Sequence, residues 1–274
     1  MITLAMDTSC MTGGVAVLDA RRVLAEYSLS VKRTHSERLM SSVARVMEDA
    51  SLLPSDIGLI ACCTGPGSFT GIRIGVASAK AMGMALGAAI VPVIGLDALA
   101  YGLSEGERAW CMIDARHENC YAASYIGTGG IPRRLTGYAV LSVTEIASRT
   151  RSSGIRHRAM GDAAINYGAR LIDEAGGLIA LPTPEDSDIR PAKVAMLGLD
   201  LFEGGMSISP DALAPFYIKH SEAEVKAELR TKLRPEAEDK AEDKADPGAD
   251  EGASEGANEG AGEEACCGGK CRPC

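Results

Sequence analysis

Aromatic residues are scarce in this sequence, at 4% of its 274 residues. Its hydrophobic core must therefore be built mainly from Ala, Val, Ile, Leu and Met side chains. The apolar share, at 46%, is nonetheless ordinary for a globular protein. A chain of this length is expected to form one or two domains, and such an aliphatic core can still bury a sheet against helices.

Long apolar runs and a leader segment are missing as well. Residues 81–93 form an apolar stretch that is too short and too rich in glycine to span a membrane. Residues 1–7 alternate apolar and polar side chains, unlike the charged and then apolar pattern of a targeting segment. A cytoplasmic protein with no membrane partner is therefore expected. Five cysteines in apolar segments are interpreted as reduced core thiols: Cys10, Cys62, Cys63, Cys111 and Cys120.

Basic residues are outnumbered, and the formal net charge is −9. The deficit is concentrated in residues 222–274, which carry 15 acidic and 8 basic side chains, whereas the remaining chain has a net charge of only −2. Neither part has the basic character of a protein that binds a phosphate backbone, although a local basic patch stays open. The acidic end is of low complexity and is expected to be disordered.

Histidines are few, and their spacing excludes a helical metal-binding pair. No two of His35, His117, His157 and His220 lie three to five residues apart. The sequence also shows no nucleophile elbow, no Cys–His pairing and no carboxylate dyad, so no catalytic residue is expected. Asp114 and Arg116 are left with two interpretations, as cleft residues or as a surface ion pair.

The order of predicted elements is typical of one architecture. The first block is expected to contain strands at 1–7, 14–18 and 23–28, a helix opened by the capping pair Thr34 and Glu37, a strand at 57–63, a helix to about 88, a strand at 90–94 and a helix at 96–103. The second is expected to contain strands at 109–113, 121–126 and 134–138, a helix opened by Ser142 and Glu145, a strand at 158–160, helices at 164–175 and 191–202, and a last strand at 215–219.

This repetition predicts an α/β fold of the duplicated actin, Hsp70 and sugar-kinase (ASKHA) class. The first lobe is expected over residues 1–104 and a smaller second lobe over 105–221, with its last strand or helix able to return to the first. Residues 222–274 would form the disordered tail.

A glycine-rich loop follows the strand at 57–63. Gly65, Gly67 and Gly71 allow backbone shapes that other residues avoid, and Ser68 or Thr70 can cap the next helix. The loop either cradles a phosphate at the helix N-terminus or is a tight strand-to-helix turn. It lacks the Gly-Lys-Ser/Thr of a Walker loop.

Small residues recur every four positions along the helix that follows: Gly71, Gly75, Ala79, Gly83 and Gly87. Each interior glycine costs roughly 1 kcal/mol relative to alanine, so a close backbone approach must offset this cost. The stripe therefore packs on its own sheet or neighbouring helix, or forms a groove for a partner's helix. Spacing alone leaves both open.

A short polar turn, Asp7-Thr8-Ser9, follows the first strand. It is either a hydrogen-bonded turn or a binding site for a metal-bound phosphate.

These segments resemble the signature of the bacterial TsaB (YeaZ) family. The most specific part is the string Thr64-Gly65-Pro66-Gly67-Ser68-Phe69-Thr70-Gly71-Ile72-Arg73-Ile74-Gly75 with Ala79-Lys80. Weaker matches are Met6 to Ser9, His35 to Leu39, Asp114 to Arg116 with Tyr121, and Pro215 to Ile218. The resemblance spans roughly residues 1 to 220.

The resemblance implies an actin-like subunit without catalysis and with no cofactor of its own. Such subunits pair with TsaD, which carries a metal site and transfers threonylcarbamoyl to the adenosine beside the tRNA anticodon. An ATPase, TsaE, completes the complex, so ATP or ADP and the metal would lie on the partners. The chain would contact tRNA only indirectly, and without TsaD it would form a homodimer through much the same surface.

The interface implied by the resemblance lies on the first lobe. Its candidate residues are His35, Leu39, Val43, Ser68, Phe69, Gly71, Arg73, Gly75, Ala79 and Gly83. Arg73 could meet a partner carboxylate or a nucleotide phosphate. The residues that could lie near a nucleotide are Asp7, Thr8, Ser9 and Arg73.

Three alternatives stand beside this interpretation. An ATP-dependent kinase or ATPase of the same fold class is the main one. Proteolysis, an old label of the family, is disfavoured because no paired zinc ligands are present. The end of the tail could bind zinc through its thiolates or be redox-active or dispensable: Cys266, Cys267, Cys271 and Cys274.

Overall fold

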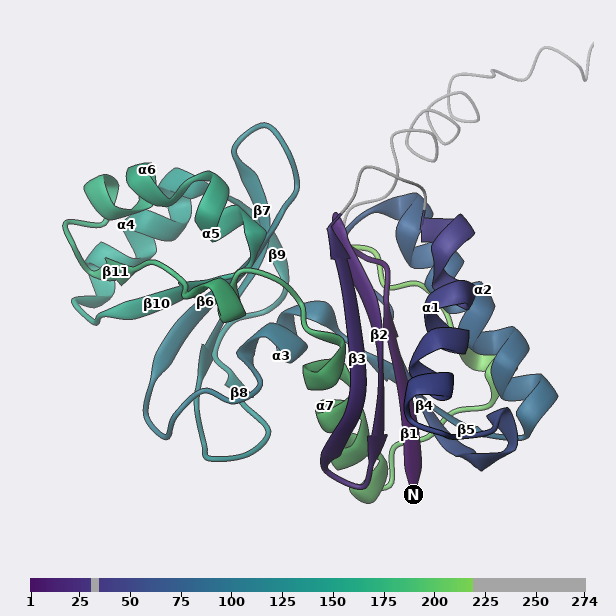
Figure 1. Ribbon diagram of the computed structural model, residues 1–274. Coiled ribbons are helices and arrows are strands. Elements are labelled where there is room, and N and C mark those ends of the chain that lie inside the picture. Colours follow the sequence, from purple (N-terminus) through teal and green to yellow (C-terminus); the bar gives the residue numbers. More distant parts are fainter. Residues whose placement is uncertain (31–34, 219–274) are drawn as a thin grey trace, which may run out of the picture. The chain divides into compact units, whose positions relative to one another are not determined.

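The computed structural model describes residues 1–30 and 35–218 of the chain (Figure 1). The predicted tail, its cysteine metal site and the capping role of Thr34 lie outside these residues. None of the helices in the described part has both the length and the apolar character of a membrane span.

The first sheet has the strand order β3-β2-β1-β4-β5. Its strands are β1 (Ile2–Asp7), β2 (Thr12–Asp19), β3 (Arg22–Ser30), β4 (Ile57–Cys63) and β5 (Ala89–Val93). The first three pair antiparallel, and β1, β4 and β5 run parallel. Strands are thus confirmed at the positions predicted for the first block.

The second strand begins earlier than its predicted start at residue 14, because β2 already begins at Thr12. A Cβ atom on Gly14 would lie 2.2 Å from the Tyr27 carbonyl oxygen and 2.8 Å from Cγ of Pro191. Glycine is needed there for close approach inside the sheet and not for chain reversal.

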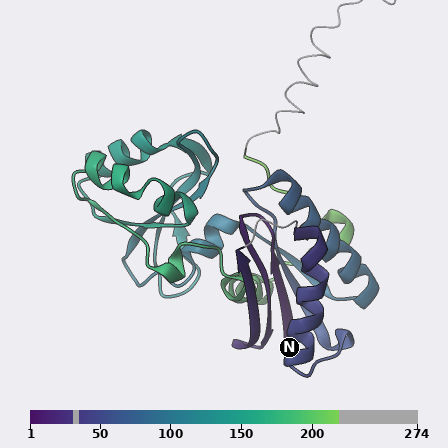
Figure 2. The ribbon, with the colours of Figure 1, turned by 45° about the horizontal axis from the view of Figure 1, so that its top comes forward.

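Three helices cover the two faces of the first sheet. The helices α1 (His35–Asp49) and α2 (Phe69–Leu86) lie side by side on one face, and Figure 2 shows the same arrangement from another angle. The helix α7 (Pro191–Glu203) packs against β1, β2 and β4, and side chains of that opposite sheet face share a core with it. The lobe boundaries at 104 and 221 stay predictions.

The second sheet repeats the first. Its order is β11-β10-β6-β7-β8, with β9 also paired to β7. Its strands are β6 (Arg108–Asp114), β7 (Asn119–Ile126), β8 (Arg133–Arg134), β9 (Ala139–Ser142), β10 (His157–Met160) and β11 (Ile179–Ala180). As in the first sheet, antiparallel pairing on one side of the opening strand is combined with parallel pairing on the other. The predicted duplicated α/β fold is confirmed.

The helices of this half are shorter. They are α3 (Gly95–Ala100), α4 (Val143–Ser153), α5 (Asp162–Asn166) and α6 (Gly168–Glu174). The predicted capping box is confirmed, because the Ser142 hydroxyl accepts the Glu145 backbone N–H and the Glu145 carboxylate accepts the Ser142 backbone N–H. All five predicted core thiols are buried, and none of them forms a disulfide within the described part of the chain.

Three predicted elements of this half are wrong. The strand predicted at 134–138 is interrupted after β8, and pairing resumes only with β9. Between them, the Ser124 backbone N–H donates to the Thr136 hydroxyl instead of to a backbone carbonyl. The helix at 164–175 is broken at Tyr167, which leaves helical geometry while its hydroxyl donates to Asp114. Residues 215–218 form no strand, and the Phe216 N–H instead bonds the Thr64 carbonyl oxygen at 2.8 Å.

Candidate functional site

Two equivalent turns follow the first strand of each sheet. Asp7 ends β1 and Asp114 ends β6. In both, Oδ1 accepts the backbone N–H two residues later, from Ser9 at 2.9 Å and from Arg116 at 2.7 Å. Such Asx-turns let a short carboxylate side chain hold a chain reversal. The duplication thus extends from the strands to the turns at their carboxyl ends.

The second of these turns is held by groups of its own half. The Asp114 carboxylate accepts Asn166 Nδ2 at 3.1 Å and the Tyr167 hydroxyl at 3.0 Å. Its contact with Arg116 is to the backbone N–H, so the interpretation of Asp114 and Arg116 as a surface ion pair is wrong. Arg116 to Glu118 adopt positive φ angles of 67°, 51° and 59°. The turn is therefore strained and tightly held.

The glycine-rich loop lies directly over the first turn. Thr8 Oγ1 donates to the Gly71 carbonyl oxygen at 2.7 Å, and the Ser68 N–H donates to the Ser9 carbonyl oxygen at 2.6 Å. A Cβ on Gly67 would lie 2.1 Å from that same Ser9 oxygen, and one on Gly71 would lie 2.0 Å from the Thr8 oxygen. Glycine is required at both positions because backbone meets backbone.

The rest of the small-residue stripe also faces inward. A Cβ on Gly75 would lie 2.5 Å from Thr8 Oγ1, and one on Gly83 would lie 2.5 Å from Cδ1 of Ile90. Ala79 is fully buried. Gly87 is not part of the stripe, because it ends α2 in the left-handed conformation.

The stripe therefore packs on its own fold, as one of the two interpretations had it. The prediction of a partner's groove is wrong for Gly71, Gly75, Ala79 and Gly83. These residues are buried, and atoms of the chain itself occupy the space beside the glycines. Close contact with the Thr8 turn and β5 offsets the helix-propensity cost of these glycines.

Carboxylates gather around Cys10, beside the first turn. Burial raises the pKa of the Cys10 thiol, and the negative charges of Asp162, Asp7 and Asp188 raise it further. Burial also raises the pKa of Asp162 to about 6, although its Oδ1 accepts the Asp114 N–H at 2.9 Å. The site is thus acidic and largely dry.

This environment bears on the predicted nucleotide contacts. Asp7, Thr8 and Ser9 are at most 1% exposed, beneath the start of α2. A nucleotide phosphate could reach them only if the glycine-rich loop moved away, and it would then meet the acidic side chains near Cys10. Within residues 1–30 and 35–218, no three His, Cys, Asp or Glu side chains are grouped as metal ligands.

Aromatic stacking orders the start of α2. Ser68 caps the helix by accepting the Gly71 N–H at 3.3 Å, as predicted. The Phe69 ring stacks on Tyr217 at 5.0 Å between centroids, and the Arg73 guanidinium lies 3.7 Å from the Phe69 centroid. Arg73 Nε donates to the Tyr217 hydroxyl at 3.0 Å. An exposed arginine is thereby held in one orientation.

Several apolar side chains are exposed on the outer sides of α1 and α2. Met40 is 50% exposed and Met84 is 65% exposed. Exposed alanines share the same helices: Ala44 lies one turn after Met40 on α1, and Ala77, Ala81 and Ala85 lie with Met84 on α2. We call these six residues the outer face. Leu39 and Val43, which were predicted at the interface, are instead core residues at 4% and 5% exposure, and the side chain of His35 lies outside the description.

The sequence analysis did not predict the outer face, although its signal is present in the sequence. Met40 follows the inward Leu39 by one position, and Met84 follows the inward Gly83. Adjacent helical positions point about 100° apart, so methionines beside the buried stripe must leave the core.

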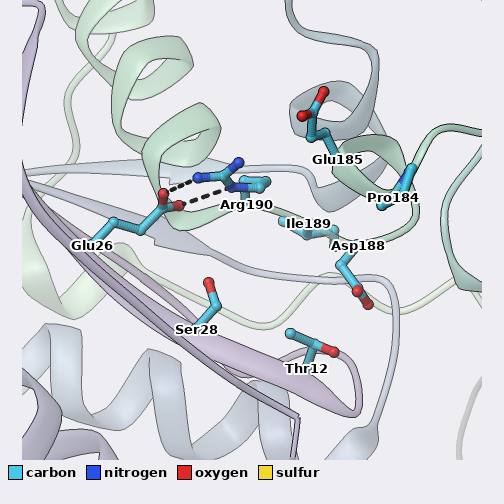
Figure 3. A pocket seen from close by; sticks show the side chains of 8 residues that line it. All are labelled: Thr12, Glu26, Ser28, Pro184, Glu185, Asp188, Ile189 and Arg190. Carbon is cyan, nitrogen blue, oxygen red and sulfur yellow. Dashed lines mark hydrogen bonds and ion pairs between the residues drawn. The ribbon is translucent and has the colours of Figure 1, made fainter.

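A cavity of about 350 Å³ lies between the strands β2 and β3 and the segment before α7 (Figure 3). It is lined by Thr12, Glu26, Ser28, Pro184, Glu185, Asp188, Ile189 and Arg190. Glu26 binds the Arg190 side chain and accepts the Ala192 N–H at 3.0 Å, so it caps α7. This cavity could not be predicted from the sequence, because its two sides come from segments that lie far apart along the chain.

Comparison with known proteins agrees with the fold. The family model described as TsaD, tRNA N6-adenosine threonylcarbamoyltransferase, matches residues 22–175. The tRNA threonylcarbamoyladenosine biosynthesis protein TsaB of Bacillus subtilis is 29% identical over 227 residues, covering 82% of this chain and 97% of the relative. An uncharacterized protein of Mycobacterium tuberculosis is 32% identical over 223 residues, covering 81% of this chain and 93% of the relative.

Solved structures add a match in three dimensions. YeaZ from Pseudomonas aeruginosa superposes with a TM-score of 0.64 at 27% identity, over 79% of this chain and 99% of that one. The family match covers more than half of the sequence, and the relatives are matched over nearly their whole length. The chain therefore belongs to the TsaD family of tRNA N6-adenosine threonylcarbamoyltransferase proteins and, within it, to the TsaB (YeaZ) group.

Proposed function

We propose that this chain takes part in tRNA threonylcarbamoyladenosine biosynthesis as a non-catalytic partner subunit that binds TsaD. The relatives named for this pathway support the process. The binding role is supported by one observation on the chain itself, the exposed outer face of α1 and α2.

The outer face suits a helical partner. Two methionines, Met40 and Met84, are at least half exposed on neighbouring helices of one sheet face. Exposed apolar clusters of this kind mark interaction sites, and methionine adapts its shape to a partner. Small side chains such as the exposed alanines of α1 and α2 allow a partner helix to approach closely. TsaD is the proposed occupant, with its own equivalent helices against this face, and a second copy of the chain occupies the same face when TsaD is absent.

The acidic surroundings of Cys10 support a role without catalysis. A phosphate bound beside Asp7 would be repelled by the buried carboxylates, so the isolated chain is expected not to hydrolyse ATP. ATP or ADP and the metal belong to the partner subunits in this proposal, and TsaE completes the complex in the cytoplasm. The alternative of an ATP-dependent kinase or ATPase requires measurable ATP turnover by the purified chain.

Copurification with TsaD tests the binding face. Met84→Glu combined with Ala81→Glu buries charge in the proposed interface and is expected to weaken TsaD binding about tenfold or more. Met206→Glu is the matched control, since Met206 is 45% exposed and lies outside the outer face. Equal TsaD binding by the double variant and the control would refute the proposed face. Substitutions at Gly75 are unsuitable, because they would disturb the Thr8 turn.

Depletion of the protein tests the pathway independently of the face. Nucleoside analysis of bulk tRNA is expected to show loss of threonylcarbamoyladenosine. Restoration by the Met206→Glu chain and failure of restoration by the Met84→Glu, Ala81→Glu chain would connect the two proposals. Undiminished threonylcarbamoyladenosine after depletion would refute the assignment to this pathway.

A further inference from the structure

Three arginines without a carboxylate partner lie at one end of the second sheet. Within the described part of the chain, Arg108, Arg133 and Arg156 make no ion pair and no side-chain hydrogen bond. Arg158, by contrast, binds Glu107 at 3.0 Å and also Asp186. Glu107 and Asp186 are thus already engaged by a different arginine.

The sheet register places two of them on one face. Arg108 of β6 pairs with Ile126 of β7, and Ile126 pairs in turn with Arg133 of β8. Residues directly opposite each other point to the same side of a sheet. Arg108 and Arg133 therefore flank Ile126 at two strand spacings, about 9 to 10 Å apart.

The third arginine joins them from the neighbouring strand. β10 pairs with β6, and Arg158 lies opposite Ala109, so β10 begins beside the start of β6. Burial lowers the pKa of His157, the first residue of β10, and the positive charge of Arg108 lowers it further. Arg156 directly precedes His157 and is exposed. We call Arg108, Arg133 and Arg156 the arginine end of the sheet.

Protection of a sheet edge explains only part of this arrangement. Charged residues on edge strands discourage pairing with other chains, which accounts for Arg133 on β8. It does not account for Arg108, because β6 is an inner strand, or for Arg156, which directly precedes the inner strand β10. Arg108 is also half-buried, so it has lost part of its hydration without gaining an anionic partner.

We propose that the arginine end binds the phosphate backbone of RNA. A guanidinium group can donate two parallel N–H bonds to the oxygens of one phosphate. Arg108 and Arg133 on their strands, with Arg156 just before β10, match a row of anions better than a single arginine. The nature of the RNA as tRNA rests on the proposed function. The chain then contacts tRNA directly through its second sheet, away from the outer face of α1 and α2.

Fluorescence anisotropy with a labelled tRNA transcript, measured over a range of salt concentrations, tests this proposal on the full chain. The variant Arg108→Gln, Arg133→Gln, Arg156→Gln is compared with Arg22→Gln, Arg116→Gln, Arg149→Gln, which removes the same charge from other exposed positions. Each lost phosphate contact lowers the slope of log K against log salt by about 0.7 to 0.9. The first variant is therefore expected to lose about 2 to 3 units of slope, and the second to bind like the unchanged protein.

Several outcomes would overturn the proposal. Equal losses in both variants would show only a general effect of net charge, and unchanged binding in the first would remove the site. Competition by polyglutamate as effective as that by unlabelled tRNA would assign the surface to an acidic protein. Thermal unfolding by circular dichroism checks that both variants are folded. TsaD copurification is measured in parallel, so a failure of the proposed partner role is distinguished from a failure of RNA binding.

Discussion

The substitution Asp162→Asn tests how much an ionised carboxylate destabilises the protein near the carboxyl ends of the strands. Asp162 begins α5, and its Oδ1 accepts the Asp114 N–H at 2.9 Å. Burial raises its pKa from 3.8 to about 6. Asparagine keeps the same acceptor oxygen and has no charge to bury, so the variant isolates the cost of the ionised carboxyl.

The sign and the size follow from the raised pKa. The folded protein holds the Asp162 proton more tightly than the unfolded chain, so this group favours folding below pH 4 and loses that contribution as the pH rises through 6. The difference of about 2 pKa units corresponds to about 3 kcal/mol. The asparagine variant should therefore be more stable than the unchanged protein at pH 8 by up to about 3 kcal/mol, and the gain should fade by pH 4.

Urea unfolding followed by circular dichroism at pH 4, 6 and 8 measures this difference. Asp173→Asn is the matched control, because Asp173 is an exposed carboxylate on α6 of the same half. Its unfolding midpoint is expected to change little between these pH values relative to the unchanged protein. A stability gain in Asp162→Asn that is equally large at pH 4 and pH 8 would refute the argument, since it could not arise from ionisation.

Two further pairs of substitutions test packing in the core. Thr3 is fully buried and its hydroxyl has no hydrogen-bond partner in the described structure, so Thr3→Val should stabilise the fold by about 1 to 2 kcal/mol in urea unfolding. Thr150→Val should instead destabilise it by about 1 to 3 kcal/mol, because the Trp110 N–H loses its acceptor. A loss of stability in both variants would contradict the assignment of the Thr3 hydroxyl as unpartnered. Gly71→Ala should lower the free energy of unfolding by about 3 kcal/mol or more, since the new Cβ would meet the Thr8 carbonyl oxygen. Gly137 faces open space, so Gly137→Ala should change the free energy of unfolding by no more than about 0.5 kcal/mol. Thermal melts measure both.

The duplicated fold could be predicted because its signals are local. Alternating and continuous apolar runs define the strands, and the Ser142 and Glu145 pair opens α4 as expected. Tyr167 could not be predicted to break its helix, because the cause is a bond from its hydroxyl to Asp114, more than fifty residues away. Such tertiary contacts override local propensity.

The candidate site was only partly predictable for a related reason. Four-residue spacing shows that Gly75 and Gly83 share one face of a helix, but it does not show what that face meets. The answer, Thr8 for one and Ile90 for the other, depends on which strands neighbour the helix. The arginine end likewise became visible only from the register that aligns Arg108 with Arg133 across β7.

The two faces of α2 connect the closed turn with the proposed binding surface. On the inner face, glycines let the helix approach until Gly71 and Thr8 share a hydrogen bond, which buries the turn where a phosphate would otherwise bind. On the outer face, Met84 and Ala81 are exposed beside α1. Because the faces are separate, an inner substitution must change stability first, whereas an outer one should change TsaD binding alone. A chain in which Met84→Glu lowered the melting temperature as much as Gly71→Ala would contradict this division of roles.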